Sequence, residues 1–373
     1  MGGNSLFIGK FLGIPVRVHT SWLLVFVLVT ASLAGAYFPQ SFPGQSPALY
    51  WGLGIVTSVF FFASVLLHEL AHSVVAQQRG LPVRDIVLFV FGGVSELSQE
   101  PENPTTEFVM AIVGPLTSIV LGGIFLLLWQ LLQLASHPLG SMLMYVGGIN
   151  LSLGVFNLIP GFPLDGGRVL RSLLWWHSRS LERATLWASR VGQFVAYAFI
   201  AIGILEVFAG GLVNGIWLIF IGWFLDNAAI SSYRQVAVQS LLAGHTVGEV
   251  MGRGCSGIPA NTPLSQVAEH YFLAEGRRCL PVMEDGVFVG LLTIHGMKEF
   301  RREEWGHRAA REAMIPRSRL RTTHPSAGLA EALQQMAEDG VNQLPVLQDG
   351  EIVGLLTREN IATFLKLKAE LGA

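Results

Sequence analysis

Long apolar runs alternate with short polar breaks through about the first 230 residues of the chain. No Asp, Glu, Lys or Arg occurs from Val18 to His68, and none occurs from Phe108 to Leu164. A helix needs about 20 largely apolar residues to cross the hydrocarbon core of a bilayer, so these runs are typical of an integral membrane protein. The pattern predicts six spanning helices, at about residues 20–38, 52–78, 107–134, 141–159, 187–207 and 212–229.

The segment between the second and third predicted spans has a different pattern. Residues 81–105 begin with alternating apolar positions and continue with the sequence Phe91-Gly92-Gly93. Alternation predicts a strand and paired glycines predict a turn, so we expect a short β-hairpin here. Strand at membrane depth is tolerated only where it is buried in protein or lines a water-filled cavity.

The pattern changes near Ser232, after which charged residues recur every few positions. The sequence LPVMEDGVFVGLLT of residues 280–293 recurs as LPVLQDGEIVGLLT at residues 344–357. Each unit predicts two strands joined by a tight Asp-Gly turn and flanked by helices. One such unit leaves an apolar sheet face exposed, so the two units should pack together. The repeat resembles a tandem pair of CBS motifs, which associate into a Bateman module.

These patterns predict the organisation of the whole chain. The expected fold class is a polytopic α-helical membrane protein with six transmembrane helices and a small membrane-associated β-hairpin or sheet, followed by a soluble α/β tandem CBS (Bateman) domain. We expect the membrane domain over residues 1–230, a linker over 231–241, the first CBS motif over 242–303 and the second over 304–373.

Composition supports the membrane assignment and excludes some partners. Of the 373 residues, 51% are hydrophobic and only 13% are charged, with a mean hydropathy of +0.51, whereas soluble domains carry about 25% charged residues. A net charge of −2 provides no basic stripe for a nucleic-acid partner. The two cysteines, Cys255 and Cys279, lie in the polar part, which excludes a disulfide scaffold and is typical of a reducing compartment.

Basic residues gather in the loops on one side of the predicted spans, and the opposite loops, at 39–51, 135–140 and 208–211, contain none. By the positive-inside rule, we expect a multi-pass protein of the inner (cytoplasmic) membrane with both termini and the CBS pair in the cytoplasm. A cleaved signal peptide ending at residues 34–36 is the alternative for the first span, disfavoured because a polytopic domain follows. We interpret Arg168 and Arg171 as anchors on the cytoplasmic side. The basic residues concerned are Lys10, Arg17, Arg79, Arg84, Arg168, Arg171 and Arg179.

The second span ends in the sequence His68-Glu69-Leu70-Ala71-His72. Histidines four residues apart lie on the same helix face, about 6 Å apart along the axis, so both imidazoles can reach one Zn²⁺ with Glu69 beside them as general base. The alternative is a pair of hydrogen-bonded polar residues inside a helix bundle. Ionisable groups at this depth are costly and are usually functional, which favours the metal site.

A catalytic zinc site needs a third protein ligand and an open position for water. The first acidic residue after the second charge-free run is Asp165, which follows the helix-breaking Pro160 and Pro163. Its carboxylate would complete a His₂Asp ligand set, with Gly166-Gly167 permitting close backbone approach. The alternative makes Asp165 an N-cap of the helix that follows.

Together these two motifs resemble those of the site-2 protease family of intramembrane zinc metalloproteases. That family combines H-E-x-x-H in one transmembrane helix with N-x-x-P-x-x-P-L-D-G in a later one, and this chain has both in full, the second beginning at Asn157. Phe91-Gly92-Gly93 and Gly114-Pro115 also stand where the family has its membrane-associated hairpin and third core helix. The whole layout resembles the bacterial and archaeal branch with C-terminal CBS repeats.

The resemblance implies roles for individual residues. His68, His72 and Asp165 would bind one Zn²⁺ per chain, Glu69 would activate water, and Asn157 would contact the substrate strand or the developing oxyanion. The substrate would be the transmembrane segment of a single-span membrane protein, such as an anti-sigma or pro-sigma regulator. We further hypothesise that an extended substrate pairs with the hairpin at Phe91, Gly92, Gly93 and Val94.

CBS pairs often bind adenine nucleotides such as ATP or AMP through a Thr/Ser-x-x-Asp pattern. The matching positions here run from Thr293 to Gly296 and from Thr357 to Asn360, so neither ends in Asp. Nucleotide binding through Thr293, Thr357 and Asn360 therefore stays a hypothesis. Its alternative is a docking platform or a homodimer interface.

Two other functions compete with proteolysis. A membrane transporter or channel for metal ions, gated by the CBS pair, could line its path with the same His and Asp residues. Transport does not require a Glu between two His residues at ligand spacing, nor the N-x-x-P-x-x-P-L-D-G sequence. A catalytically inactive scaffold is disfavoured because all three ligands and the base are present. His₂-carboxylate sites also bind Fe(II), so the donor set favours zinc without excluding another divalent ion.

Overall fold

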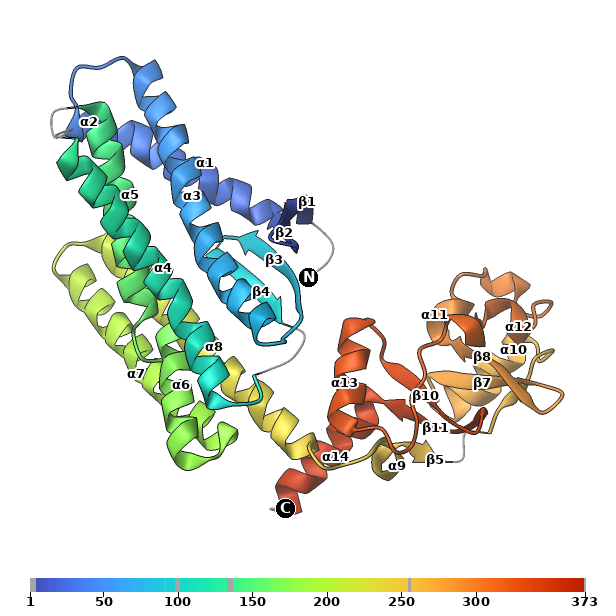
Figure 1. Ribbon diagram of the computed structural model, residues 1–373. Coiled ribbons are helices and arrows are strands. Elements are labelled where there is room, and N and C mark those ends of the chain that lie inside the picture. Colours follow the sequence, from blue (N-terminus) through green and yellow to red (C-terminus); the bar gives the residue numbers. More distant parts are fainter. Residues whose placement is uncertain (1–4, 91, 98–100, 133–136, 254–255, 372–373) are drawn as a thin grey trace. The chain divides into compact units, whose positions relative to one another are not determined.

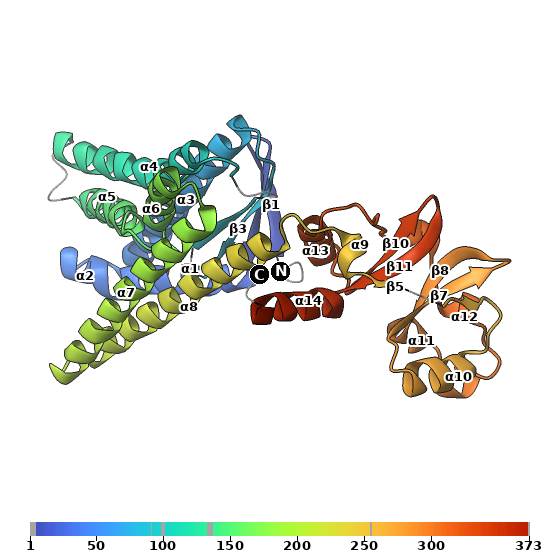
Figure 2. The same cartoon turned by 90° about the horizontal axis from the view of Figure 1, so that it is seen from below.

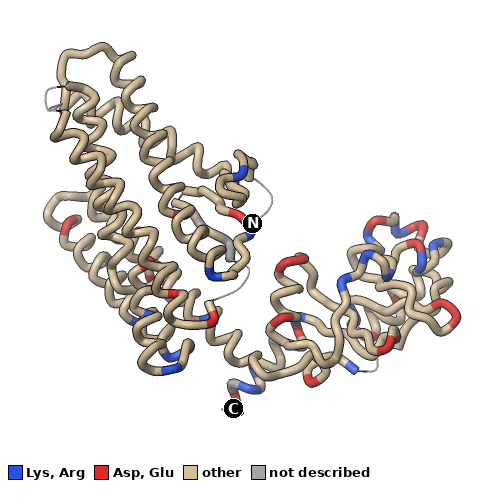
Figure 3. Tube along the Cα trace, in the orientation of Figure 1, with Lys and Arg blue, Asp and Glu red and all other residues tan. Residues whose placement is uncertain are grey.

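The computed structural model describes residues 5–90, 92–97, 101–132, 137–253 and 256–371, and it leaves out the side chains of residues 94, 96, 97 and 369. The chain divides into two compact units, Met1–Val236 and Ala237–Ala373. Charged residues are sparse along the helices of the first unit and frequent along the second (Figure 3).

The first unit contains the six apolar helices that the sequence predicts (Figure 1). Three of them begin in the same way, with Pro in the first turn and a side chain of the preceding residue (Ser46, Asn103 or His137) accepting a backbone N–H. Both features satisfy or remove free amides at a helix start. The spans are α1 to α2 (Thr20–Ser41, including the π-helical turn Leu33–Tyr37), α3 (Pro47–Gln78), α4 (Pro104–Leu131), α5 (Pro138–Asn157), α7 (Leu181–Phe208) and α8 (Leu212–Leu242).

A seventh helix, α6 (Asp165–Ser178), is shorter and follows the proline-containing segment after α5. It packs against α4 and α7, while α4 also packs against α3 and α5. Helix α4 is therefore in contact with both helices that carry the predicted metal ligands (Figure 1).

A four-stranded sheet adjoins α3, with the strand order β1 (Ser5–Phe11), β2 (Ile14–His19), β3 (Val83–Phe89) and β4 (Gly92–Leu97). Strands β2 and β3 are parallel and the other two pairs are antiparallel. The hairpin predicted within 81–105 is confirmed as β3–β4. The N-terminal hairpin β1–β2 was not predicted, because its apolar positions precede the first charge-free run and its alternation is short.

The second unit contains two small sheets (Figures 1 and 2). At the turns that join β7 to β8 and β10 to β11, Asp285 and Asp349 have φ of 49° and 53° and each is followed by a glycine with positive φ. These values confirm the predicted tight Asp-Gly turns. The strands are β5 (Gly252–Arg253), β6 (Ile258–Pro259), β7 (Cys279–Glu284), β8 (Val287–Thr293), β9 (Ile315–Pro316), β10 (Gln343–Gln348) and β11 (Glu351–Thr357). The helices of four or more residues are α9 (Val247–Val250), the π-helix Val267–Ala274, α11 (Ile294–Met297), α12 (Ala310–Ala313), α13 (Leu329–Glu338) and α14 (Arg358–Leu371).

The two repeats exchange their first segments. Strand β5, at the start of the first repeat, pairs with β11 of the second, and β9, at the start of the second repeat, pairs with β8 of the first. Met251 and Met314 accordingly pack into the core of the other repeat. Each hydrophobic core of this unit therefore contains residues from both sequence repeats.

The predicted linker over 231–241 is not an irregular connection. Helix α8 continues without a break to Leu242, which is buried in the core formed mainly by the second repeat. The apolar residues Val236, Val238 and Leu242 near this end of α8 are buried or partly buried, and this burial explains why the segment stays helical.

Candidate metal centre

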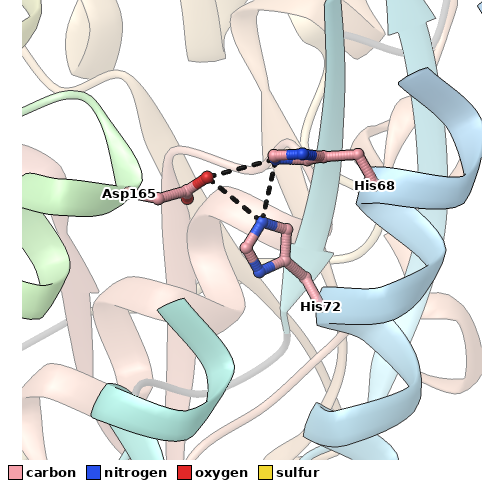
Figure 4. A group of neighbouring side chains, drawn as sticks. All are labelled: His68, His72 and Asp165. Carbon is pink, nitrogen blue, oxygen red and sulfur yellow. Dashed lines mark hydrogen bonds and ion pairs between the residues drawn. The ribbon is translucent and has the colours of Figure 1, made fainter. Parts of the chain in front are cut away.

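Helices α3 and α6 bring together three side chains that could hold a metal ion (Figure 4). His68 and His72 lie one helical turn apart on α3, and their Nε2 atoms are 3.2 Å from each other. Oδ2 of Asp165, the first residue of α6, is 3.1 Å from His68 Nε2 and 3.3 Å from His72 Nε2. The two imidazoles are only 4% and 7% exposed. The predicted His₂Asp set therefore converges at one buried point.

The other nitrogen of each imidazole has a partner on α4. His72 Nδ1 donates to the Met110 carbonyl oxygen at 2.6 Å, and His68 Nδ1 lies 2.9 Å from the Ser118 hydroxyl oxygen. A carbonyl can only accept, so Nδ1 of His72 carries a proton, and the neutral imidazole would bind a metal through Nε2. Such outer contacts orient metal-binding histidines. The residues present therefore fit a divalent metal ion.

A glycine on α4 makes room for the three donors. A Cβ at Gly114 would overlap His72 Nε2 and would lie 2.8 Å from His68 Nε2. Any larger residue would fill the space between the imidazoles. Gly114 thus has a steric reason at this point of the fold.

Glu69 faces the sheet and does not belong to the three-residue cluster. Its Oε2 accepts a hydrogen bond of 3.2 Å from the Ser95 hydroxyl on β4, and Ser95 Oγ lies 3.0 Å from Ser73 Oγ. A Cβ at Gly93 would lie 3.0 Å from Glu69 Cδ, so β4 packs directly on this carboxylate. The side chain of Glu69 is thereby held against β4.

The carboxylate of Asp165 is free to reach the site because it does not cap the start of its own helix. The residue at the N-cap of α6 is Leu164, and Asp165 is already helical with its carboxylate turned to the imidazoles. The alternative interpretation of Asp165 as an N-cap is therefore wrong. A Cβ at Gly167 would overlap the backbone of Gly161 and Phe162, which confirms the close backbone approach expected at the glycine pair.

Asn157, at the end of α5, is half-buried, and its Nδ2 donates to the Leu153 carbonyl oxygen at 3.1 Å. Within the described part of the chain, no hydrogen bond joins it to the three ligands. The structure thus leaves Asn157 outside the cluster.

Strand β4 occupies one end of the sheet. Gly92, Gly93 and Val94 pair with Phe89, Leu88 and Val87 of β3, and no other described strand pairs with the opposite edge of β4. Phe91 lies outside the described residues. The predicted pairing positions are thus on an edge strand next to Glu69.

One buried ion pair near the site was not predicted. Arg171 on α6 is 6% exposed and donates through Nε to Glu107 Oε1 at 2.6 Å, and its Nη2 also contacts that oxygen. Glu107 on α4 is fully buried. The interpretation of Arg171 as a membrane anchor is therefore wrong, because its charge is neutralised inside the protein. One feature of the sequence could have indicated this pair. Glu107 is the last charged residue before the second charge-free run, so it lies at the start of an apolar helix.

The CBS residues proposed for nucleotide binding form local helix caps. Thr293 Oγ1 accepts from the Gly296 amide at 3.1 Å, and a Cβ at Gly296 would overlap the Ala313 carbonyl oxygen. Thr357 donates through its amide and hydroxyl to Asn360 Oδ1 at 3.1 and 2.7 Å. The Asn360 amide in turn donates to Thr357 Oγ1 at 3.1 Å.

Family models match both units of the chain. The model of peptidase family M50 matches residues 56–139 and 130–201, which include the three clustered side chains. The CBS domain model matches residues 247–302 and 310–367.

Individual relatives cover nearly the whole chain. Rip3 from Mycobacterium tuberculosis is 34% identical over 97% of this chain and 93% of its own length, and sll0528 from Synechocystis is 35% identical over 98% and 97%. The zinc metalloprotease MJ0392 from Methanocaldococcus jannaschii is 27% identical over 98% of both chains. Among solved structures, the site-2 protease from Methanocaldococcus jannaschii is 29% identical, covers 61% of this chain and 95% of its own, and has a TM-score of 0.43. The chain belongs to peptidase family M50, the site-2 proteases, and is a multi-pass membrane metalloprotease with a C-terminal pair of CBS domains.

Proposed function

We propose that the protein hydrolyses a peptide bond within or near the transmembrane segment of a single-span membrane protein, using one Zn²⁺ bound by His68, His72 and Asp165. The observation that carries the proposal is the convergence of three donor atoms within 4.8 Å of one another, while both Nδ1 atoms bond elsewhere. The metalloprotease family favours this function over a CBS-gated metal transporter, and the complete donor set disfavours an inactive scaffold.

The chemistry divides between the metal and the chain. When bound, Zn²⁺ lowers the pKa of a coordinated water to about 7 and polarises the scissile carbonyl. The Glu69 carboxylate accepts the proton of the attacking water and passes it to the leaving amine. Ser95 orients this carboxylate through its hydroxyl hydrogen bond.

Substrate binding would use the free edge of β4. A peptide bond inside a helix has its carbonyl and amide engaged within the helix, so the substrate has to unwind near the cleavage site. An extended segment can then form main-chain hydrogen bonds with an edge strand. The contact of Gly93 with Glu69 supports this placement, because a segment paired with β4 would run past the base. Asn157 would contact the substrate or the oxyanion only after a rearrangement of its side chain.

The proposal also includes a cellular location, a substrate class and a role for the CBS pair. The loop distribution of Lys and Arg supports a location in the inner (cytoplasmic) membrane with both termini and the CBS pair in the cytoplasm. Regulators such as anti-sigma or pro-sigma factors are the proposed substrate class. The CBS pair would regulate the protease, as a homodimer interface or as a site for ATP or AMP at Thr357 and Asn360.

The decisive experiment compares wild-type protein with Glu69→Gln in detergent, measuring zinc content and cleavage of a generic single-span substrate. We expect about one zinc per chain in both proteins and cleavage by the wild type alone, because the substitution removes the base and keeps the ligands. Glu206→Gln serves as the matched control, since Glu206 is an exposed glutamate of α7.

Two results would contradict the proposal. Cleavage by Glu69→Gln at the wild-type rate would exclude Glu69 as the base. Wild-type protein that binds no zinc when zinc is supplied would exclude the metal site.

A further inference from the structure

One face of α4 contacts both helices that supply the three proposed ligands. Glu107, Met110, Gly114 and Ser118 are spaced by three or four residues, so they lie on the same face of the helix. Met110 and Ser118 bond the two imidazoles, and Gly114 leaves space between them. Glu107, one turn before Met110, binds Arg171 of α6. The same face therefore holds both the helix of the two histidines and the helix of the aspartate.

Arg171 also contacts the segment that delivers Asp165. Its guanidinium carbon lies 5.2 Å from the centre of the Phe162 ring, within the range of a cation–π contact. Phe162 is 7% exposed, and its amide donates to the Ala188 carbonyl oxygen of α7 at 3.4 Å. Arg171 thus bridges Glu107 on α4 and the loop that ends at Asp165. Its Cα lies about 9 Å along α6 from that of Asp165, at 1.5 Å per residue.

We infer that the buried Arg171–Glu107 ion pair is a positioning element of the metal centre, which holds α6 and the 158–164 loop against α4 so that Asp165 meets the two imidazoles. The inference rests on the proposed zinc site. Arg168 contributes less, because its Nε is 3.8 Å from Glu107 Oε1 and its side chain is 23% exposed. None of the hydrogen bonds and ion pairs described for Arg171 and Glu107 joins them to the three ligands, so their effect on the metal would pass through Asp165.

The test removes both charges together. Removing one partner of a buried pair leaves an unpaired charge and destabilises the fold, whereas apolar residues of similar size in place of both are often tolerated. The variant is therefore Glu107→Met with Arg171→Met, in the full chain. The measurements are the rate of zinc release to a chelator and the thermal unfolding of the metal-free protein. We expect zinc release to accelerate about 10-fold, the low end of the range for groups bonded directly to metal ligands, because the pair acts through Asp165, with the metal-free melting temperature close to wild type.

A conservative variant and a matched control complete the design. Arg171→Lys keeps the charge but loses the two-point contact and the planar stacking, so its release rate should lie between those of the wild type and the double variant. Arg190→Met removes an arginine that stacks on Trp187 at the same 5.2 Å, but within α7, and should leave zinc release unchanged.

The outcomes separate the inference from the function on which it rests. Zinc release at the wild-type rate from both the double variant and Arg171→Lys would overturn the positioning role and leave the zinc site intact. If the double variant does not fold, Arg171→Lys alone decides by its release rate. Absence of bound zinc in the wild type, or wild-type zinc retention in Asp165→Asn, would overturn the zinc site and the inference with it.

Discussion

In the membrane unit, His68 and His72 form hydrogen bonds to residues of α4 and α6, whereas in the CBS pair Thr357 and Asn360 bond to each other across the start of a single helix. Asp165 belongs to the first kind, because the cap of its helix falls on Leu164 and its carboxylate reaches α3. In the membrane unit these polar side chains bond to other helices, whereas in the CBS pair they bond within their own helix start.

This difference bears on what each motif can bind. Side chains already bonded within their own turn offer fewer atoms to a ligand, as Asn360 Oδ1 accepts two hydrogen bonds from Thr357. At the metal centre, the contacts to α4 occupy only Nδ1 and leave Nε2 directed at Asp165. The metal centre is therefore arranged to receive a ligand, while the CBS caps first satisfy their own backbone.

The largest effect is expected from a substitution that occupies the space between the two imidazoles. Gly114→Ala adds a Cβ where it would overlap His72 Nε2, so we expect zinc affinity to fall at least 100-fold, beyond the range of about 10- to 100-fold for outer partners. Zinc titration of the purified protein measures the effect. Gly123→Ala on the same helix is the control, because its Cβ would meet nothing within 4 Å. Equal zinc affinity in both variants would show that α3 and α4 are not packed as described.

The CBS half-sites offer a second test with a moderate effect. Gly296→Asp has no room beside the Ala313 carbonyl oxygen, so we expect a loss of about 1–3 kcal/mol of stability, typical of overpacking. Asn360→Asp can keep the cap with Thr357, so its melting temperature should stay near wild type. Thermal unfolding with and without ATP or AMP measures both.

A nucleotide-induced rise in melting temperature that is larger for Asn360→Asp than for wild type would support a ribose contact at the second half-site. No rise in either protein would favour the docking or dimer role. If Gly296→Asp were as stable as wild type, the close approach at Ala313 would be wrong.

The smallest effect is expected from removing the hydrogen bond to Glu69, the proposed base. Ser95→Ala removes the hydroxyl that donates to Glu69 Oε2, and a bond to a charged group contributes about 1.5–3 kcal/mol. We expect a cleavage rate about tenfold lower, at the low end of that range, with unchanged zinc content. Ser64→Ala is the control, since Ser64 bonds only the Phe60 carbonyl oxygen of its own helix in the contacts described. A rate equal to wild type would mean that β4 does not orient the base.

Much of the fold follows from local pattern. The six spans, the β3–β4 hairpin and the Asp-Gly turns of the CBS repeats depend on interactions within about 20 residues of chain, which hydropathy and turn chemistry record directly. The β1–β2 hairpin is local as well, but its alternation is short, and only its place in the sheet depends on a distant strand, through the pairing of β2 with β3. The exchange of β5 and β9 depends on pairing with distant strands and has no local signal strong enough to predict it.

The side chains that could bind a metal are readable from the chain, because the H-E-x-x-H spacing and a later acidic residue are local features of its residues. The groups that support these side chains come from packing between helices and strands: Ser118 and Met110 behind the imidazoles, Ser95 beside Glu69, and Arg171 with Glu107 inside the bundle. These contacts could not be predicted, because what a charged side chain does depends on whether lipid, water or an opposite charge surrounds it. Arg171 at a lipid boundary would be an anchor, but buried against Glu107 its charge holds two helices together.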